Sequence, residues 1–353
     1  MKFLSDKKYA PVLVIAFGLL LVLINYAEPA YRTGYIISQV VPNAPKWFEW
    51  GKYDVSVERV ELNTSNNNNN QDRSSGVRRE LIYIYLPVGV IRPAFVILLP
   101  GFTPDGALDT RLVNLARSFA RAGIGVAVPD SSTIRKRIFS GDDIELIKLT
   151  FYFLQDQDYV DKERIGICGF SVAGSYALRA ASELGSGPLF VLSLGGYFNL
   201  GELIAQIISK TASYDGSTRP WEPNPMPEEV ISNNFIRHIG VESIKQINQE
   251  SLSFEDAKKY IQMLPEVVLI NLSALSPSPT LPGIKTRVFL IHDKNDDVIP
   301  VEDSYKIRDL LPRNIPVHLT ELSSFDHVTP ENFFSLDTLK LSWQVLNIVK
   351  MLI

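Results

Sequence analysis

A serine stands where the sequence predicts a sharp turn between a strand and a helix. Ser171 lies in GFSVAG (169–174), after an apolar stretch and before an alanine-rich one. A serine in such a turn exposes its hydroxyl, and the N-terminus of the following helix favours developing negative charge. Because every tight turn favours small residues, the motif alone leaves two roles open for Ser171. It is either a reactive residue or only a small residue that the turn requires.

The chemical interpretation of Ser171 requires two partners later in the chain. A serine hydroxyl needs a base to take its proton, and the base needs a carboxylate to orient it. An acidic loop, DKNDD (293–297), follows one predicted strand, and His327 follows the next. The order Ser, Asp, His, each at the carboxyl end of a strand, is the arrangement that an open α/β sheet requires.

Other reactive side chains are weaker candidates for a catalytic role. Cys168 belongs to the strand before the turn and is predicted to be a small core residue rather than a nucleophile. Asp130 ends a strand and is an alternative acid, whereas His292, His318 and His238 are expected to be structural. With one cysteine and four histidines, no Cys/His cluster has metal-ligand spacing, and the chemistry needs no metal or organic cofactor.

The elements that must position these residues alternate between strands and helices. This alternation predicts an α/β fold with a mostly parallel, doubly wound sheet and helices on both of its faces. A hairpin over residues 53–87 precedes it. The continuous apolar strand-like runs lie at 94–100, 124–130, 164–169 and 189–196.

The alternation is interrupted once. Residues 198–283 are helix-like and proline-rich, which predicts a cap inserted over one end of the sheet. The core is therefore expected in two parts, 53–197 and 284–353. The aromatic residues Trp221 and Phe235 of the cap are expected to pack rather than to line a pocket.

The N-terminal residues differ in composition from the rest of the chain. Lysines precede the apolar run Ala10–Ile24, and no charge appears between Lys8 and Glu28. Residues 1–28 are predicted to be a single-pass membrane anchor, with its N-terminus in the cytoplasm and the rest of the chain across the membrane. A cleaved signal peptide, which would release a secreted protein, is the alternative; no clean A-x-A site follows the run. Residues 29–52, which include Pro29, Pro42 and Pro45, are expected to be a linker.

Composition excludes some partners. The 353 residues carry a formal net charge of −4 and are 46% hydrophobic, which suits a globular core. A nearly balanced charge gives no sign of the basic surface that binds nucleic acid. We therefore expect a small-molecule partner, with membrane contact through the N-terminal helix.

The residues from Tyr53 to the C-terminus, without the cap, resemble the α/β-hydrolase superfamily, nearest to its dienelactone-hydrolase-like and prolyl-peptidase-like branches. HDKNDDVIP (292–300) resembles the acid loop of these families, which implies Asp296 as the acid. Asp293 stands where they usually have glycine, and Asp297 adjoins and could substitute. The turn usually ends in glycine or alanine, and here it has Ala173.

The same resemblance implies an oxyanion hole made of backbone N–H groups. One is the N–H of Val172, directly after the nucleophile. These families often have His-Gly after the first buried strand, where this chain has Pro100-Gly101. Because proline has no N–H, the second donor is expected to be Phe102, with Thr103 as the next choice.

The resemblance therefore implies a serine hydrolase that cleaves a carboxylic ester, or less readily an amide. Ser171 would form an acyl-enzyme, His327 would act as base, and Asp296 would orient the imidazole. Two alternatives stay open. The same three residues could serve an acyltransferase or a peptidase, or the fold could belong to a catalytically inactive, membrane-tethered binding protein.

Overall fold

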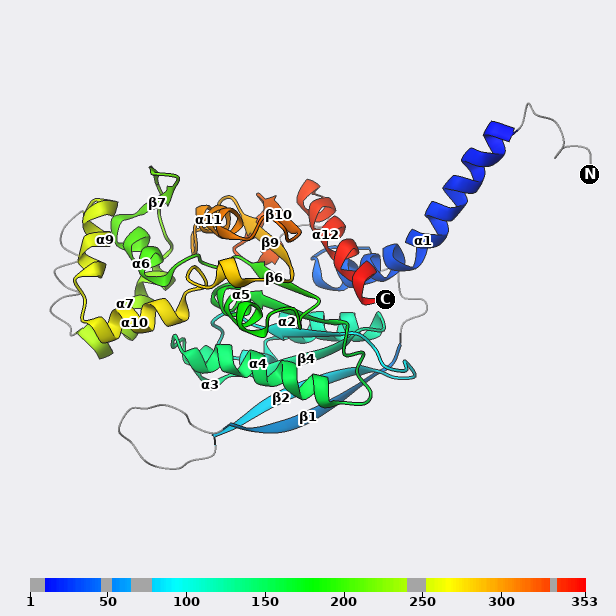
Figure 1. Ribbon diagram of the computed structural model, residues 1–353, viewed down its shortest axis with the longest axis horizontal. Helices are drawn as coiled ribbons and strands as arrows, with labels where there is room; N and C mark the ends of the chain where they lie inside the picture. Colours follow the sequence, from blue (N-terminus) through cyan, green and yellow to red (C-terminus); the bar gives the residue numbers. More distant parts are fainter. Residues whose placement is uncertain (1–9, 46–52, 65–77, 240–251, 331–334) are drawn as a thin grey trace, which may run out of the picture.

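The computed structural model describes the backbone of most of the chain (Figure 1). The described residues are 10–45, 53–64, 78–239, 252–330 and 335–353; the side chains of 10–24, 63–64, 78–79, 235–239, 326 and 329–330 are not described. The lysines before the apolar run, residues 46–52 of the expected linker, and the side chains of Phe235 and His238 therefore lie outside the described part.

An eight-stranded sheet forms the centre of the molecule, in the order β1-β2-β4-β3-β5-β6-β9-β10. The β1–β2 and β2–β4 pairs are antiparallel, and all other neighbours are parallel. The mostly parallel sheet predicted from the alternation is thus confirmed. The strands are β1 (Val55–Thr64), β2 (Arg78–Pro87), β3 (Phe95–Leu99), β4 (Gly125–Asp130), β5 (Ile165–Phe170), β6 (Phe190–Leu194), β9 (Arg287–Asp293) and β10 (Val317–Leu322).

Helices cover both faces of this sheet, so the central strands are apolar throughout. In β3, Ile97 and Leu99 join a core with α4 and α5, whereas Val96 and Leu98 face the opposite core with α1, α2 and α12. This division follows from the two-residue period of a strand. The helices outside the insertion are α1 (Ala10–Val40), α2 (Thr110–Arg121), α3 (Ser132–Arg135), α4 (Gly141–Asp156), α5 (Val172–Leu184), α11 (Glu302–Leu310) and α12 (Leu336–Leu352).

The insertion between β6 and β9 contains helices and one small hairpin (Figure 1). The hairpin pairs β7 with β8 in antiparallel fashion. Buried apolar residues of α6 and α9 join the core that also contains α5, so this part of the insertion packs on the helices that cover the central sheet. Its elements are α6 (Leu200–Ser209), β7 (Thr211–Tyr214), β8 (Ser217–Pro220), α7 (Pro225–Ile239), α9 (Phe254–Gln262) and α10 (Glu266–Leu275).

Helix α1 corrects the expected linker. Of the residues expected to be a linker, those up to Val40 are helical, and α1 contacts both α2 and α12. Tyr35, Ile36 and Ile37 are buried there. Because consecutive residues point to different sides of a helix, their burial means that neighbouring elements cover most of this turn. The prolines that indicated a linker are accommodated, since Pro29 lies inside the helix and Pro42 follows its end.

The predicted membrane anchor depends on the apolar run Ala10–Ile24, whose side chains lie outside the described part. The backbone of this run is the first half of α1. Within the described residues, the structure contains no helix with the length and apolar character needed to span a bilayer.

Candidate active site

Ser171 occupies the turn between β5 and α5, and its backbone is strained. Its φ is 54° and its ψ is −131°, a left-handed region that a non-glycine residue rarely adopts. The Ser171 N–H donates to Leu194 O on the neighbouring strand at 2.7 Å, and Ser171 O accepts from Gly174 N at 2.8 Å. The turn is therefore held by hydrogen bonds on both sides, which fixes the position of the serine side chain.

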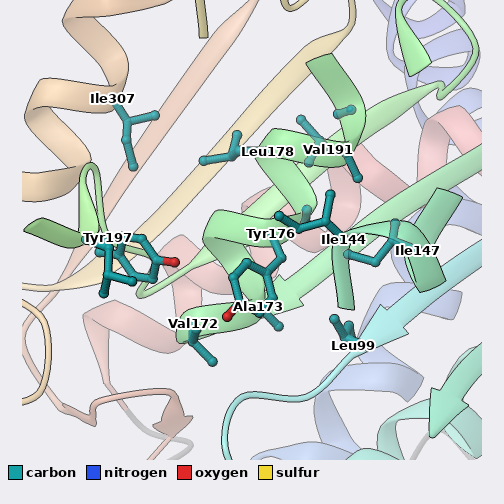
Figure 2. Close-up of a cluster of buried hydrophobic side chains, with 14 of the residues drawn as sticks. Leu99, Ile144, Ile147, Val172, Ala173, Tyr176, Leu178, Val191, Tyr197 and Ile307 are labelled. Carbon is teal, nitrogen blue, oxygen red and sulfur yellow. The ribbon is translucent and has the colours of Figure 1, made fainter. Parts of the chain in front are cut away.

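The glycines around Ser171 allow α5 to approach the sheet. A Cβ at Gly169 would lie 2.0 Å from Ala173 O, and one at Gly174 would lie 2.5 Å from Ser193 Oγ. Beyond this close approach, Ala173 and Tyr176 of α5 are completely buried, as Figure 2 shows for the core on this face of the sheet. The small residues and the half-buried Ser171 belong to one turn. The need for small residues in the turn and a reactive role for the serine are therefore compatible.

Asp296 lies in the loop after β9 and is almost fully buried. One carboxylate oxygen, Oδ1, accepts from the N–H groups of Val298 and Ile299 at 2.8 and 3.0 Å. The other, Oδ2, accepts from His327 Nδ1 at 2.6 Å. Burial opposes the charge, but His327, aided by contact with His292, outweighs it and holds the pKa of Asp296 below its ordinary value. The carboxylate is therefore ionised and aimed at the imidazole.

His327 lies in the turn of a short hairpin. The hairpin pairs β11 (Phe325–Asp326) with β12 (Thr329–Pro330), two strands of two residues each. Its φ is 53°, so the backbone of this residue is strained as well as that of Ser171. The ring lies against Gly195, where a Cβ would approach His327 Cε1 to 3.1 Å. Gly195 directly follows Leu194, whose carbonyl holds Ser171, so the ring lies beside the turn.

The second ring nitrogen of His327 has no hydrogen-bond partner among the described residues, although it is buried. A buried nitrogen without a partner is costly unless a ligand or reacting group completes it. Ser171 and His327 line the same cavity, which has a volume of about 530 Å³. With Nδ1 donating to Asp296, the neutral ring presents Nε2 as an acceptor, which is the tautomer that a general base requires.

Asp293 and His292 brace the acid loop. Asp293, the departure from the glycine of the family pattern, accepts from Asn295 N at 2.6 Å and from Phe325 N at 2.7 Å, so it joins the acid loop to the histidine hairpin. His292 is completely buried between Ser304 Oγ and Ile299 O, at 2.7 and 2.8 Å. Its ring holds the return of the acid loop, in keeping with the structural role expected for it.

The loop after β3 lies directly against Ser171. A Cβ at Gly101 would approach Ser171 Cβ to 2.7 Å and Phe170 O to 3.0 Å, so only glycine lets the loop come this close. The next residue, Phe102, is one predicted oxyanion donor, and its ring packs edge-on against Phe139. The other, Val172, is the first residue of α5, where an N–H has no partner within its own helix.

The weaker candidates lie in other environments. Cys168 is buried, and burial raises the pKa of its thiol, which disfavours the nucleophilic thiolate. Asp130 accepts from Ala107 N and pairs with Arg135 at 3.4 Å, in contacts separate from His327. His318 stacks on Phe289. Among the described residues, no group of three or more His, Cys, Asp or Glu side chains is placed to hold a metal ion.

Two residues of the insertion contribute to the site in a way that the sequence did not indicate. The indole N–H of Trp221 donates to Asp296 O at 2.8 Å. The side chain of Asn224 donates to Asp297 Oδ1 at 2.8 Å, and its backbone N–H donates to Asp297 O. Trp221 therefore packs, as expected, but it packs on the acid loop. No local sequence signal identifies contacts between segments about 75 residues apart.

Comparison with known sequences finds a similarity to a bacterial protein. No protein-family model matches it. Over 238 residues it is 24% identical to the uncharacterized 31.7 kDa protein in the traX-finO intergenic region of Escherichia coli, a stretch that covers 64% of this chain and 80% of that protein.

Solved structures resemble the whole fold. The 2,6-dihydroxy-pseudo-oxynicotine hydrolase matches with a TM-score of 0.53 at 17% identity, covering 84% of this chain and 68% of that one. The acetyl xylan esterase from Paenibacillus sp. R4 matches with 0.51 at 14% identity, covering 85% and 89%. An acylaminoacyl peptidase matches with 0.50 at 14% identity; the match covers 83% of this chain but only 40% of that one. The chain therefore has the α/β-hydrolase fold, as predicted, and the likeness at these identities concerns the fold alone.

Proposed function

We propose that the protein is a serine hydrolase that cleaves carboxylic esters. The observation that carries this proposal is the 2.6 Å hydrogen bond from His327 Nδ1 to the buried Asp296 carboxylate, in the same cavity as the strained Ser171. A lone serine in a turn has many uses. A serine beside a histidine that an ionised aspartate orients, with Nε2 left open, is the arrangement that activates a hydroxyl.

The proposed reaction proceeds through an acyl-enzyme. Ser171 Oγ attacks the ester carbonyl carbon while His327 Nε2 takes its proton, and Asp296 stabilises the resulting imidazolium. The N–H groups of Val172 and Phe102 hold the oxyanion. The tetrahedral intermediate collapses, and His327 returns the proton to the departing alcohol. Water, deprotonated by His327, then attacks the acyl carbon and releases the acid and free Ser171.

Labelling by a fluorophosphonate probe tests this proposal. Such probes bond covalently only to an activated serine, so the folded protein should be labelled at Ser171, as identified by peptide mass spectrometry. Heat-unfolded protein is the control and should stay unlabelled. A folded protein that resists the probe would show the inactive binding protein of the sequence analysis instead. Product analysis with an ester, a peptide and an alcohol acceptor then separates the esterase from a peptidase and an acyltransferase.

We also propose that the apolar run Ala10–Ile24 anchors the protein in a membrane, with the hydrolase-fold part outside the cytoplasm. Lysines before the run and the absence of charge within it support this orientation. The full-length protein should stay in the membrane fraction after an alkaline carbonate wash, and protease added outside the cells should digest its core. Release of a shortened chain would indicate the signal peptide, and a full-length soluble chain would contradict both.

A further inference from the structure

The cavity at Ser171 extends in two directions. One arm lies under the insertion and is lined by residues of α6 and α7, among them Leu203, Ile207, Met226 and Val230. The other, which we call the α1 arm, lies on the opposite side, between the sheet and the helices α1, α2 and α12. The α1 arm is lined from these three helices by Ile36, Ile37, Leu115, Phe119, Leu341 and Ile348.

The floor of the α1 arm is one row of the sheet. Leu98, Cys168 and Leu192 line the cavity, and they are register partners on the neighbouring strands β3, β5 and β6. Cys168 precedes Ser171 by three residues, so at about 3.3 Å per residue the arm descends roughly 10 Å along the sheet from the nucleophile. Cys168 lies between the two leucines, and its smaller side chain leaves more room in the cavity at the middle of the row.

The lining of the α1 arm is apolar except near its opening. The charged pair Asp109 and Arg111 and the amides of Asn114 and Gln39 also line the cavity. Arg111 and Asn114 are exposed and Gln39 is half-buried, so these residues mark an opening between the end of α1 and the start of α2. A well-packed core contains few voids larger than a water molecule, so an apolar cavity connected to a serine is a candidate binding site.

The chemistry of the lining selects the occupant. A peptide would carry an N–H and a C=O for each residue, and the apolar walls would leave these groups without partners. A hydrocarbon chain has no such groups, and each of its methylenes gains from leaving water. We propose that the α1 arm binds the acyl chain of the substrate, which is an ester of an unbranched fatty acid. This inference rests on the esterase proposed above.

Chain-length preference is the first test. With p-nitrophenyl acetate, butyrate, octanoate and palmitate, kcat/KM should rise by about fourfold per added methylene until the arm is full, the factor expected for full burial of each methylene. A profile that is flat, or that falls beyond butyrate, would overturn the assignment of the arm while leaving the esterase proposal intact.

A matched pair of substitutions on α12 tests whether this arm sets the preference. Leu341 is buried and lines the arm, whereas Leu339 is two-thirds exposed on the same helix. Leu341→Trp should fill the arm and lower the palmitate-to-butyrate activity ratio at least tenfold, and Leu339→Trp should leave this ratio unchanged. If Leu341→Trp unfolds, as judged by circular dichroism, Leu341→Phe replaces it. Equal loss on both esters in a folded variant would contradict the inference.

Direct binding separates this inference from the proposed function. Ser171→Ala, which cannot form an acyl-enzyme, should bind the fluorescent fatty acid cis-parinaric acid, and palmitate should displace it. Adding Leu341→Trp to this variant should weaken binding at least tenfold. Binding without ester turnover in the unchanged protein would refute the esterase and support the arm as a site for apolar chains. Turnover of short esters with no fatty-acid binding would refute the arm alone.

Discussion

We expect the replacement of Ser171 by alanine to lower kcat for ester hydrolysis by about 10⁶-fold, the size of effect seen when a nucleophile that acts as one unit with its base is removed. The physical reason is that the variant loses the atom that bonds to the acyl carbon, while Asp296 and His327 remain paired. The measurement is the initial rate of p-nitrophenyl ester hydrolysis at saturating substrate, compared with the unchanged protein.

The control for Ser171→Ala is Ser182→Ala on the same helix. Among the described residues, Ser182 Oγ donates to Arg179 O within its own helix, so its loss should leave kcat unchanged. Alanine keeps the Cβ and the hydrogen bonds of the turn, so the thermal unfolding midpoint of Ser171→Ala should stay close to that of the unchanged protein. A folded Ser171→Ala variant with unchanged kcat would refute Ser171 as the nucleophile.

Local patterns along the chain predicted the fold, and those around Ser171 predicted the turn, because both depend on short-range features of the sequence. A buried parallel strand is a short apolar run, and the turn from β5 to α5 needs glycine at 169 and 174 for close packing. The acidic loop and the histidine followed from a topological rule, since the carboxyl ends of parallel strands lie at one edge of a sheet. The resemblance to the acid loop of known families implied Asp296 within that loop. The structure brings Asp296 and His327 together at that edge.

The features that the sequence did not indicate depend on contacts between segments far apart in the chain. Prolines near α1 indicated a linker, but burial of Tyr35, Ile36 and Ile37 against α2 and α12 outweighs the one hydrogen bond that Pro29 removes. The contact of Trp221 with the acid loop likewise has no local signature. These interactions depend on which segments the folded chain brings together, and a periodic pattern within one segment carries no such information.

The choice of Asp296 over its neighbour Asp297 depends on a similar long-range contact. Both follow β9 and both are aspartates, so spacing alone left them as alternatives. The Asp296 carboxylate reaches His327, whereas the Asp297 carboxylate accepts from Asn224 in the insertion. The lowered pKa of Asp296 keeps it ionised at neutral pH, so it can only accept a hydrogen bond from the ring.

Asp296→Asn should therefore lower kcat by about 10⁴-fold, because the amide can donate to Nδ1 and move the ring proton to Nε2, where it blocks the base. Asp297→Asn is the matched control: it keeps an oxygen for Asn224 and should leave kcat near that of the unchanged protein. Both variants should keep the circular dichroism spectrum of the folded chain. The reverse result, a large loss at 297 and little at 296, would transfer the orienting role to Asp297. A small effect at both positions would mean that His327 works without an orienting carboxylate, and the proposed mechanism would then lose the contact on which it is built.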